Sequence, residues 1–131
     1  MEKIIELFKK DKFAKYCGIQ IIDVRLGFAK CNMKITENHL NGLGTLMGGA
    51  TYTLADFCFG LAANSHGVIA VSLNAFISYT QKCDSGVITA TATEVSRGNK
   101  TGVYRVCITN AQDQLIAELT GTAYLKEAKI K

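Results

Sequence analysis

The feature that most constrains the fold is a change of hydrophobic period at Gly67. Before it, apolar residues recur every three or four positions between Ala50 and Asn64, which predicts one helix buried on most of its circumference. After it, the period falls to two, as in strands. The predicted strands are 68–79, 87–95, 103–109 and 115–125. The turns between them are short and polar, so the sheet is antiparallel and has to cover the single apolar helix.

The N-terminal third adds a helix and a hairpin to this plan. Residues 2–16 place apolar side chains on one side and lysines on the other, which predicts an amphipathic helix. Two β-prone runs, 19–26 and 28–35, flank Gly27, as in a tight hairpin, and a polar loop follows. With no linker or repeat, residues 1–131 are predicted to form a single domain.

Composition excludes several classes of protein. A chain that is 48% apolar and 20% charged is globular and not disordered. The net charge of +4 comes from lysines near both ends, without a basic run interleaved with aromatics, so nucleic acid is not an expected partner. No apolar run approaches the roughly 20 residues of a membrane span, and no signal-peptide pattern is present, so a cytoplasmic location without membrane contact is expected. The five scattered cysteines predict reduced structural residues and no metal site.

Chemistry is concentrated at the start of the predicted central helix. Gly48 and Gly49 stand where this helix begins, so free N–H groups point outward and no Cβ obstructs a ligand. This arrangement favours the binding of an anion. Asp56 interrupts the apolar pattern further along the same helix. We therefore interpret this stretch as the chemical centre of the chain.

Six motifs follow one another in the order of a known family. They are Asn41-Gly, Gly48-Gly49, Thr53-Leu-Ala-Asp56, Asn64-Ser-His-Gly67, Arg97-Gly-Asn-Lys-Thr-Gly-Val-Tyr104 and Leu119-Thr-Gly-Thr-Ala-Tyr124. Over roughly residues 15–125, the chain resembles the hotdog-fold acyl-CoA thioesterases of the PaaI type. The resemblance implies an α+β fold in which a five- to six-stranded antiparallel sheet wraps one long helix, with a short N-terminal helix. It also implies homodimers, or homotetramers made from them, that hydrolyse acyl-CoA without a separate cofactor.

Three catalytic positions follow from this resemblance. Asp56 matches the catalytic carboxylate, Gly48 the N–H that faces the thioester oxygen, and Asn41 a polar residue near the reacting centre. Asp56 either attacks the carbonyl or activates water, and burial that raised its pKa would favour the second role. Met47 stands where the family usually has histidine, and its thioether accepts hydrogen bonds only weakly and cannot donate one.

The spacing of Gly48 and Asp56 adds a constraint of its own. On one helix, eight residues separate two positions by about 12 Å along the axis and about 80° around it. The two groups cannot reach one carbonyl from a single chain. If both act on the same thioester, Asp56 comes from one subunit and Gly48 from another, so an obligate dimer with two composite sites is expected.

Other polar positions are candidates for substrate binding. They are Met47, Gly49, Ser72, Asn74, Arg97, Asn99, Lys100 and Thr101. Ser72 and Asn74 lie on a predicted strand, where the alternation of polar and apolar residues would by itself also place polar residues. The last four belong to a predicted turn that either holds CoA phosphates or is merely solvated.

The remaining candidates have simpler explanations. His39 is predicted to be a surface residue of the loop, and His66 to be a cation favoured at a helix end. Tyr104 and Tyr124 are predicted to pack and not to act in catalysis. The leading prediction is a thioesterase for aryl or medium-chain acyl groups, and Met47 motivates a non-catalytic acyl-CoA binder as the alternative. A hydratase would need a histidine paired with an acid, which the motif lacks.

Overall fold

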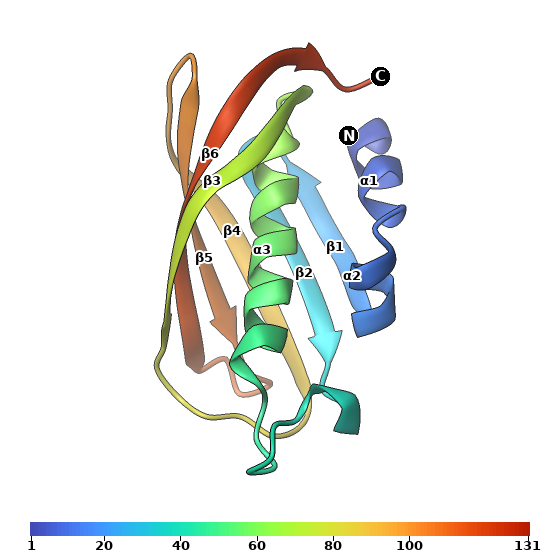
Figure 1. Cartoon of the computed structure of the whole chain (residues 1–131), viewed down its shortest axis with the longest axis vertical. Helices are drawn as coiled ribbons and strands as arrows, with labels where there is room; N and C mark the ends of the chain where they lie inside the picture. Colours follow the sequence, from blue (N-terminus) through green and yellow to red (C-terminus); the bar gives the residue numbers. More distant parts are fainter.

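The computed structural model describes residues 1–131 as one long helix wrapped by a six-stranded antiparallel sheet (Figure 1). The helices are α1 (Glu2–Lys9), α2 (Lys12–Cys17) and α3 (Gly48–Asn64), with a short 3₁₀ turn η1 (Glu37–His39). The strands are β1 (Ile19–Arg25), β2 (Phe28–Lys34), β3 (Val68–Tyr79), β4 (Val87–Arg97), β5 (Thr101–Thr109) and β6 (Leu115–Lys129). Their order in the sheet is β1-β2-β4-β5-β6-β3, which confirms the predicted α+β arrangement. None of the helices has the length and apolar character needed to cross a membrane.

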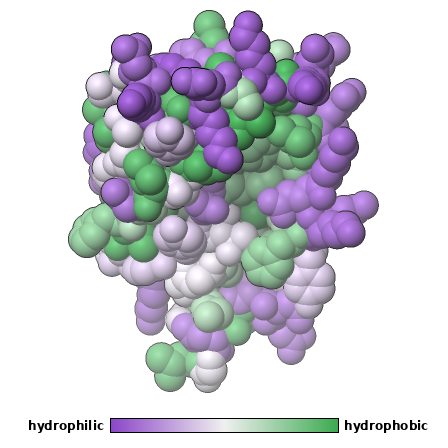
Figure 2. All heavy atoms as spheres, turned by 45° about the horizontal axis from the view of Figure 1, so that its top comes forward, coloured by the Kyte–Doolittle hydropathy of each residue, from purple (hydrophilic) through white to green (hydrophobic).

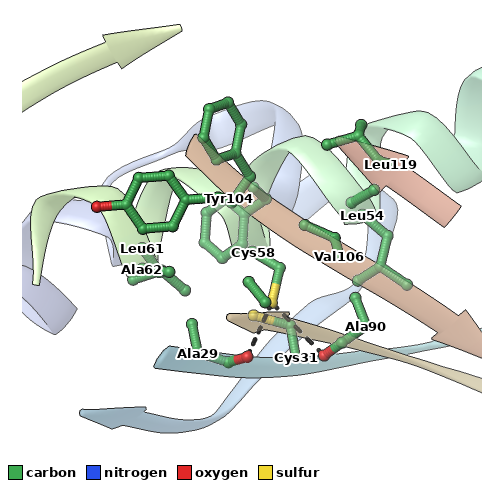
Figure 3. Packing of buried hydrophobic residues seen from close by; sticks show 14 of the residues in the cluster. Ala29, Cys31, Leu54, Cys58, Leu61, Ala62, Ala90, Tyr104, Val106 and Leu119 are labelled. Carbon is green, nitrogen blue, oxygen red and sulfur yellow. Dashed lines mark hydrogen bonds between the residues drawn. The ribbon is translucent and has the colours of Figure 1, made fainter. Parts of the chain in front are cut away.

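Helix α3 is buried because its apolar residues occupy most of its circumference, as their spacing predicts. Leu54, Cys58 and Leu61 are fully buried against the sheet (Figure 3). The helix ends before Gly67, whose φ of 86° is a left-handed conformation that favours glycine and stops a helix. The predicted helix stop is therefore confirmed.

The close approach of α3 to the sheet depends on Gly121 of β6. A Cβ at this position would lie 2.7 Å from Cε2 of Phe59, whose ring also packs against Tyr104 at 5.6 Å between centroids. Real Cβ atoms do not come so close, so the helix or the ring would have to move. Gly121 thus allows α3 to pack closely against β6 at this point.

Gly121→Ala is expected to lower the free energy of unfolding by about 1–3 kcal/mol, the usual cost of overpacking a core. Urea unfolding followed by circular dichroism measures this change. Gly98→Ala is the matched control, because its Cβ would meet nothing closer than the Thr101 carbonyl oxygen at 3.6 Å. Equal stability of the two variants would contradict the proposed packing role.

The N-terminal segment differs from its prediction. The single helix expected over 2–16 is two helices, since the chain turns between Lys10 and Asp11. The physical reason is local: Oδ1 of Asp11 accepts a hydrogen bond from the Ala14 N–H at 2.9 Å and starts a second helix as its N-cap. The sequence did not reveal this break, because an aspartate among lysines is also compatible with the polar face of one continuous amphipathic helix.

The polar turn before β5 is also shorter than predicted. Arg97 is the last residue of β4 and Thr101 the first of β5, so only residues 98–100 connect them. The Gly98 N–H donates to the Thr101 carbonyl at 2.8 Å and closes the connection as a tight hairpin.

Strand β3 forms one edge of the sheet and pairs only with β6. Its exposed side chains include Val71, Leu73, Phe76 and Tyr79. Hydrophobic residues are visible between hydrophilic ones on the surface of the molecule (Figure 2). A long edge with unpaired backbone groups and apolar side chains is suited to pairing with another strand.

Candidate active site

The start of α3 presents two backbone N–H groups that have no acceptor within the chain. Met47 occupies the N-cap position with an extended backbone but has no side-chain oxygen to cap the helix. The Ala50 and Thr51 N–H groups donate to the Met47 carbonyl at 3.0 and 3.3 Å, whereas those of Gly48 and Gly49 make no hydrogen bond. Both free donors stand at the positive end of the helix dipole. This is the donor arrangement that the sequence predicts.

Tyr79 of β3 fixes this helix start from the side. Its hydroxyl donates to the Gly48 carbonyl at 2.8 Å, and a Cβ on Gly48 would lie 3.1 Å from its ring. A larger residue at this position would therefore require the ring to shift by a few tenths of an ångström. Sequence reasoning missed Tyr79, because a tyrosine on a strand is usual and gives no signal of such a contact.

Met47 faces solvent next to these donors, with its side chain folded over Gly49. A Cβ on Gly49 would lie 3.4 Å from Cε and 3.8 Å from Sδ of Met47. Met47 and Gly49 also line a cavity of about 610 Å³ between α2, η1 and the start of α3, together with the stacked rings of Phe13 and Tyr16. At the position where the family resemblance leads us to expect a histidine, the chain therefore has an apolar thioether.

Asn41 organises the loop that leads into the helix. Its Oδ1 accepts from the N–H groups of Leu43 at 2.9 Å and Thr45 at 3.2 Å, and its Nδ2 donates to Thr45 Oγ1 at 3.0 Å. The side chain thus holds the loop in shape, as asparagine commonly does in turns. Its role near the reacting centre stays a prediction.

Asp56 is half-buried on α3 and lines a small cavity of about 200 Å³. Ser72 of β3 lines the same cavity, as do Phe8 and Asp11 from the N-terminal helices. Burial raises the pKa of Asp56, and the Asp11 carboxylate raises it further. The direction expected from burial is confirmed, while the contribution of Asp11 was not expected.

Asp56 and Gly48 do not line a common cavity. The Gly48 backbone borders a different cavity, with Tyr79 and Thr51. This separation agrees with the helical geometry, which places the two positions about 12 Å apart along the axis. The structure therefore brings Asp56 and Ser72 together, and separately gathers Met47, Gly48 and Gly49.

Comparison with known proteins places the chain in a family. The thioesterase superfamily matches residues 43–117, which is more than half of the chain and includes Gly48 and Asp56. The chain belongs to the thioesterase superfamily. A putative esterase from Archaeoglobus fulgidus is 36% identical over 119 residues, 90% of this chain and 77% of the relative. The acyl-coenzyme A thioesterase PaaI of Escherichia coli K12 is 36% identical over 119 residues, 90% of this chain and 85% of the relative.

Solved structures of thioesterase relatives share the whole fold. The E. coli PaaI protein superposes with a TM-score of 0.93 at 33% identity, covering 99% of this chain and 98% of its own. A hypothetical thioesterase protein of Streptococcus pneumoniae, solved with coenzyme A, superposes with a TM-score of 0.88 at 27% identity, covering 95% of this chain and 98% of its own. The predicted resemblance, the hotdog fold and the enzyme class are confirmed at the level of the family. The roles of individual residues stay predictions.

The remaining predicted binding residues lie elsewhere on the thioesterase fold. Asn74 is exposed on β3, beyond a bulge that separates its register from that of Ser72, and it does not line the cavity of Asp56. At the β4–β5 hairpin, Asn99, Lys100 and Thr101 are all exposed. Arg97 is half-buried, and its Nη1 is buried without a hydrogen-bond acceptor. Because this nitrogen is inaccessible to solvent, it does not support the predicted phosphate contact of Arg97, which stays a prediction.

His39 is not the surface residue that the sequence predicts. It is 7% exposed, its Nδ1 accepts from the Thr36 N–H at 2.9 Å, and its Nε2 donates to the Cys17 carbonyl at 2.8 Å. Both ring nitrogens are therefore occupied in holding η1 against α2. A short polar loop gave no sign of this burial, which arises from the packing of α2 more than twenty residues earlier in the chain.

A second histidine network lies at the other end of α3. His66 Nε2 and the Tyr104 hydroxyl both contact Oε1 of Glu94, at 2.9 and 2.6 Å. Burial alone would raise the pKa of Glu94, but these two hydrogen bonds lower it. Tyr104 is fully buried, which agrees with its predicted packing role. This network supports the structure and lies apart from the free N–H groups at the helix start.

Proposed function

We propose that this protein hydrolyses acyl-CoA thioesters to the free acid and CoA at sites shared between two subunits. The observation that carries the proposal is the pair of free N–H groups at the start of α3, with a half-buried carboxylate eight residues later on the same helix. Membership of the thioesterase superfamily supports the reaction. The E. coli relative named acyl-coenzyme A thioesterase and the S. pneumoniae relative solved with coenzyme A support the substrate.

The Gly48 N–H stabilises the charge that develops during the reaction. Attack on the thioester carbon turns its carbonyl oxygen into an oxyanion, which accepts a hydrogen bond from this donor. The donor is fixed in place before the reaction, because Tyr79 holds the Gly48 carbonyl and packs over its Cα. Preorganised donors of this kind contribute about a hundred- to a thousand-fold in rate.

Asp56 of the other subunit either provides the attacking oxygen itself or activates the water molecule that attacks. Its carboxylate attacks the carbonyl carbon, expels the CoA thiolate and leaves a mixed anhydride that water hydrolyses, or it takes a proton from a water molecule that attacks directly. In both routes one water is consumed, and the free acid and the CoA thiol are released. The raised pKa of Asp56, caused by burial and by Asp11, makes the carboxylate a better base at neutral pH.

The edge strand β3 provides a surface on which a second copy can bind. Its exposed Val71, Leu73 and Phe76 and its unpaired backbone edge support pairing with the same strand of another chain. Such pairing would place the two α3 helices on the same side of one continuous sheet. Assembly as a homodimer, or as a tetramer of two dimers, is therefore part of the proposal.

The proposed activity is tested by free-thiol release from a panel of short-chain, medium-chain and aryl acyl-CoA thioesters. Turnover by the wild type well above that of Asp56→Asn on at least one thioester is expected. If the wild type binds acyl-CoA but turns it over no faster than Asp56→Asn, the protein is a non-catalytic acyl-CoA binder. The apolar Met47 next to the donors is the observation that favours this second function.

Met47→His is expected to raise kcat by about 2- to 10-fold, the effect of one added hydrogen bond at the reacting centre. The exposed position of Met47 leaves room for the imidazole without repacking the core. Met47→Leu is the matched control, because it replaces the thioether without adding a donor. A kcat for the histidine variant no higher than that of the leucine variant would exclude this role for position 47.

A further inference from the structure

The N-terminal helices pack directly beside Asp56. The Phe8 ring meets Phe57 edge-on, with 5.5 Å between ring centroids. A Cβ on Gly60 would lie 3.1 Å from Cε2 of the same Phe8 ring, so the ring lies close against the α3 backbone. These contacts bring the junction between α1 and α2 to the cavity that contains Asp56.

Asp11 stands at this junction and is held by the backbone on both sides. Its Oδ1 accepts from the Ala14 N–H at 2.9 Å, and its own N–H donates to the Phe8 carbonyl at 3.1 Å. The carboxylate that caps α2 therefore has a fixed place in the structure. Asp11 also lines the cavity of about 200 Å³ that contains Asp56.

No other ionisable side chain lines this cavity. The rest of the lining comes from Phe8 of α1, from apolar or uncharged residues of α3, and from Ala70, Val71 and Ser72 of β3 and Ala123 of β6. Lys9 and Lys15 line a neighbouring cavity of about 550 Å³ that Asp11 also borders. Within its own cavity, Asp56 thus faces one charge, and that charge has the same sign.

We propose that Asp11 is a second functional carboxylate of this site, which acts electrostatically on Asp56 across the cavity that the two residues line together. Asp11 does not touch the thioester in this proposal, so it is a positioning residue that tunes the catalytic group. The inference rests on the proposed function for its consequence in catalysis, but the electrostatic coupling between the two carboxylates stands without it.

The sign of the effect follows from the charges. Burial raises the pKa of Asp56 first, and the Asp11 carboxylate raises it further. Removing the charge of Asp11 therefore lowers the pKa of Asp56. Because Asp11 is exposed to solvent, the shift should shrink as added salt screens the interaction.

Asp11→Asn is the appropriate variant because asparagine is as good an N-cap as aspartate, so α2 keeps its cap while the charge is lost. Asp11→Ser provides a second neutral cap. Asp84→Asn is the control for a change in net charge, since Asp84 is exposed in the loop between β3 and β4 and borders neither cavity. All variants are made in the full chain.

The Asp56 carboxyl is titrated directly by carbon-13 NMR of labelled aspartate, with Asp56→Asn to assign its signal. In Asp11→Asn and Asp11→Ser the titration midpoint should move to lower pH, and the acid limb of the kcat/KM profile should move with it. An unchanged midpoint, or an equal shift in Asp84→Asn, would overturn the proposal. If the two Asp11 variants shift the midpoint but the wild type shows no thioesterase turnover, the result would count against the proposed function alone.

Discussion

Asp56→Asn is expected to lower kcat/KM for acyl-CoA hydrolysis by about 10²- to 10⁴-fold, the usual contribution of a positioned acid–base group. Asparagine has nearly the same shape as aspartate but is neither a useful base nor a nucleophile toward a thioester. Both proposed routes therefore fail in the variant. The measurement is the initial rate of free-thiol release over a range of substrate concentrations.

Stability measurements provide the control for this variant. Because burial raises the pKa of Asp56 in the folded protein above its unfolded value, the ionised carboxylate disfavours folding at pH values above the folded pKa. Removing the charge should thus leave the protein at least as stable at neutral pH, with the difference fading as pH falls and Asp56 becomes protonated. An inactive variant that is also markedly less stable would point to a structural role for Asp56.

Gly48→Pro is expected to lower kcat by about 10²- to 10³-fold, because proline has no N–H to donate to the oxyanion. Proline is well tolerated at the first position of a helix, so α3 should still form. Substrate affinity should change less than kcat, since the lost hydrogen bond strengthens only as charge develops on the carbonyl oxygen.

Gly48→Ala separates the loss of the donor from the added bulk. It keeps the N–H but places a Cβ 3.1 Å from the Tyr79 ring, as proline also would. Activity in the alanine variant well above that of the proline variant assigns the larger loss to the missing N–H. Equal losses in both would show that crowding at Tyr79, and not the donor, limits the reaction.

The sequence predicts the fold well where one pattern extends over many residues. The period change at Gly67 separates α3 from four strands, and that glycine has the left-handed conformation that its position as a helix stop requires. The glycines before α3 likewise predict free N–H groups, because the first N–H groups of any helix lack intrahelical acceptors. Such features depend on local chemistry that is visible in the sequence.

What the sequence could not show are contacts made between distant segments. Tyr79 reaches Gly48 across 31 residues, and His39 reaches Cys17 across 22. Asp11 came to the cavity of Asp56 because a helix expected to be continuous breaks there and folds against α3. Each of these contacts depends on tertiary packing, and none of them produces a periodic pattern in the sequence.

The central claim, that each site combines Asp56 of one subunit with Gly48 of another, is tested most directly by mixing two inactive chains. Differently tagged Asp56→Ala and Gly48→Pro proteins are co-expressed, and the heterodimer is isolated by both tags. In such a heterodimer one site has both groups intact and the other has neither, so about half of the wild-type activity per dimer is predicted. Activity no higher than that of the two parent homodimers, in verified heterodimers, would contradict the shared site.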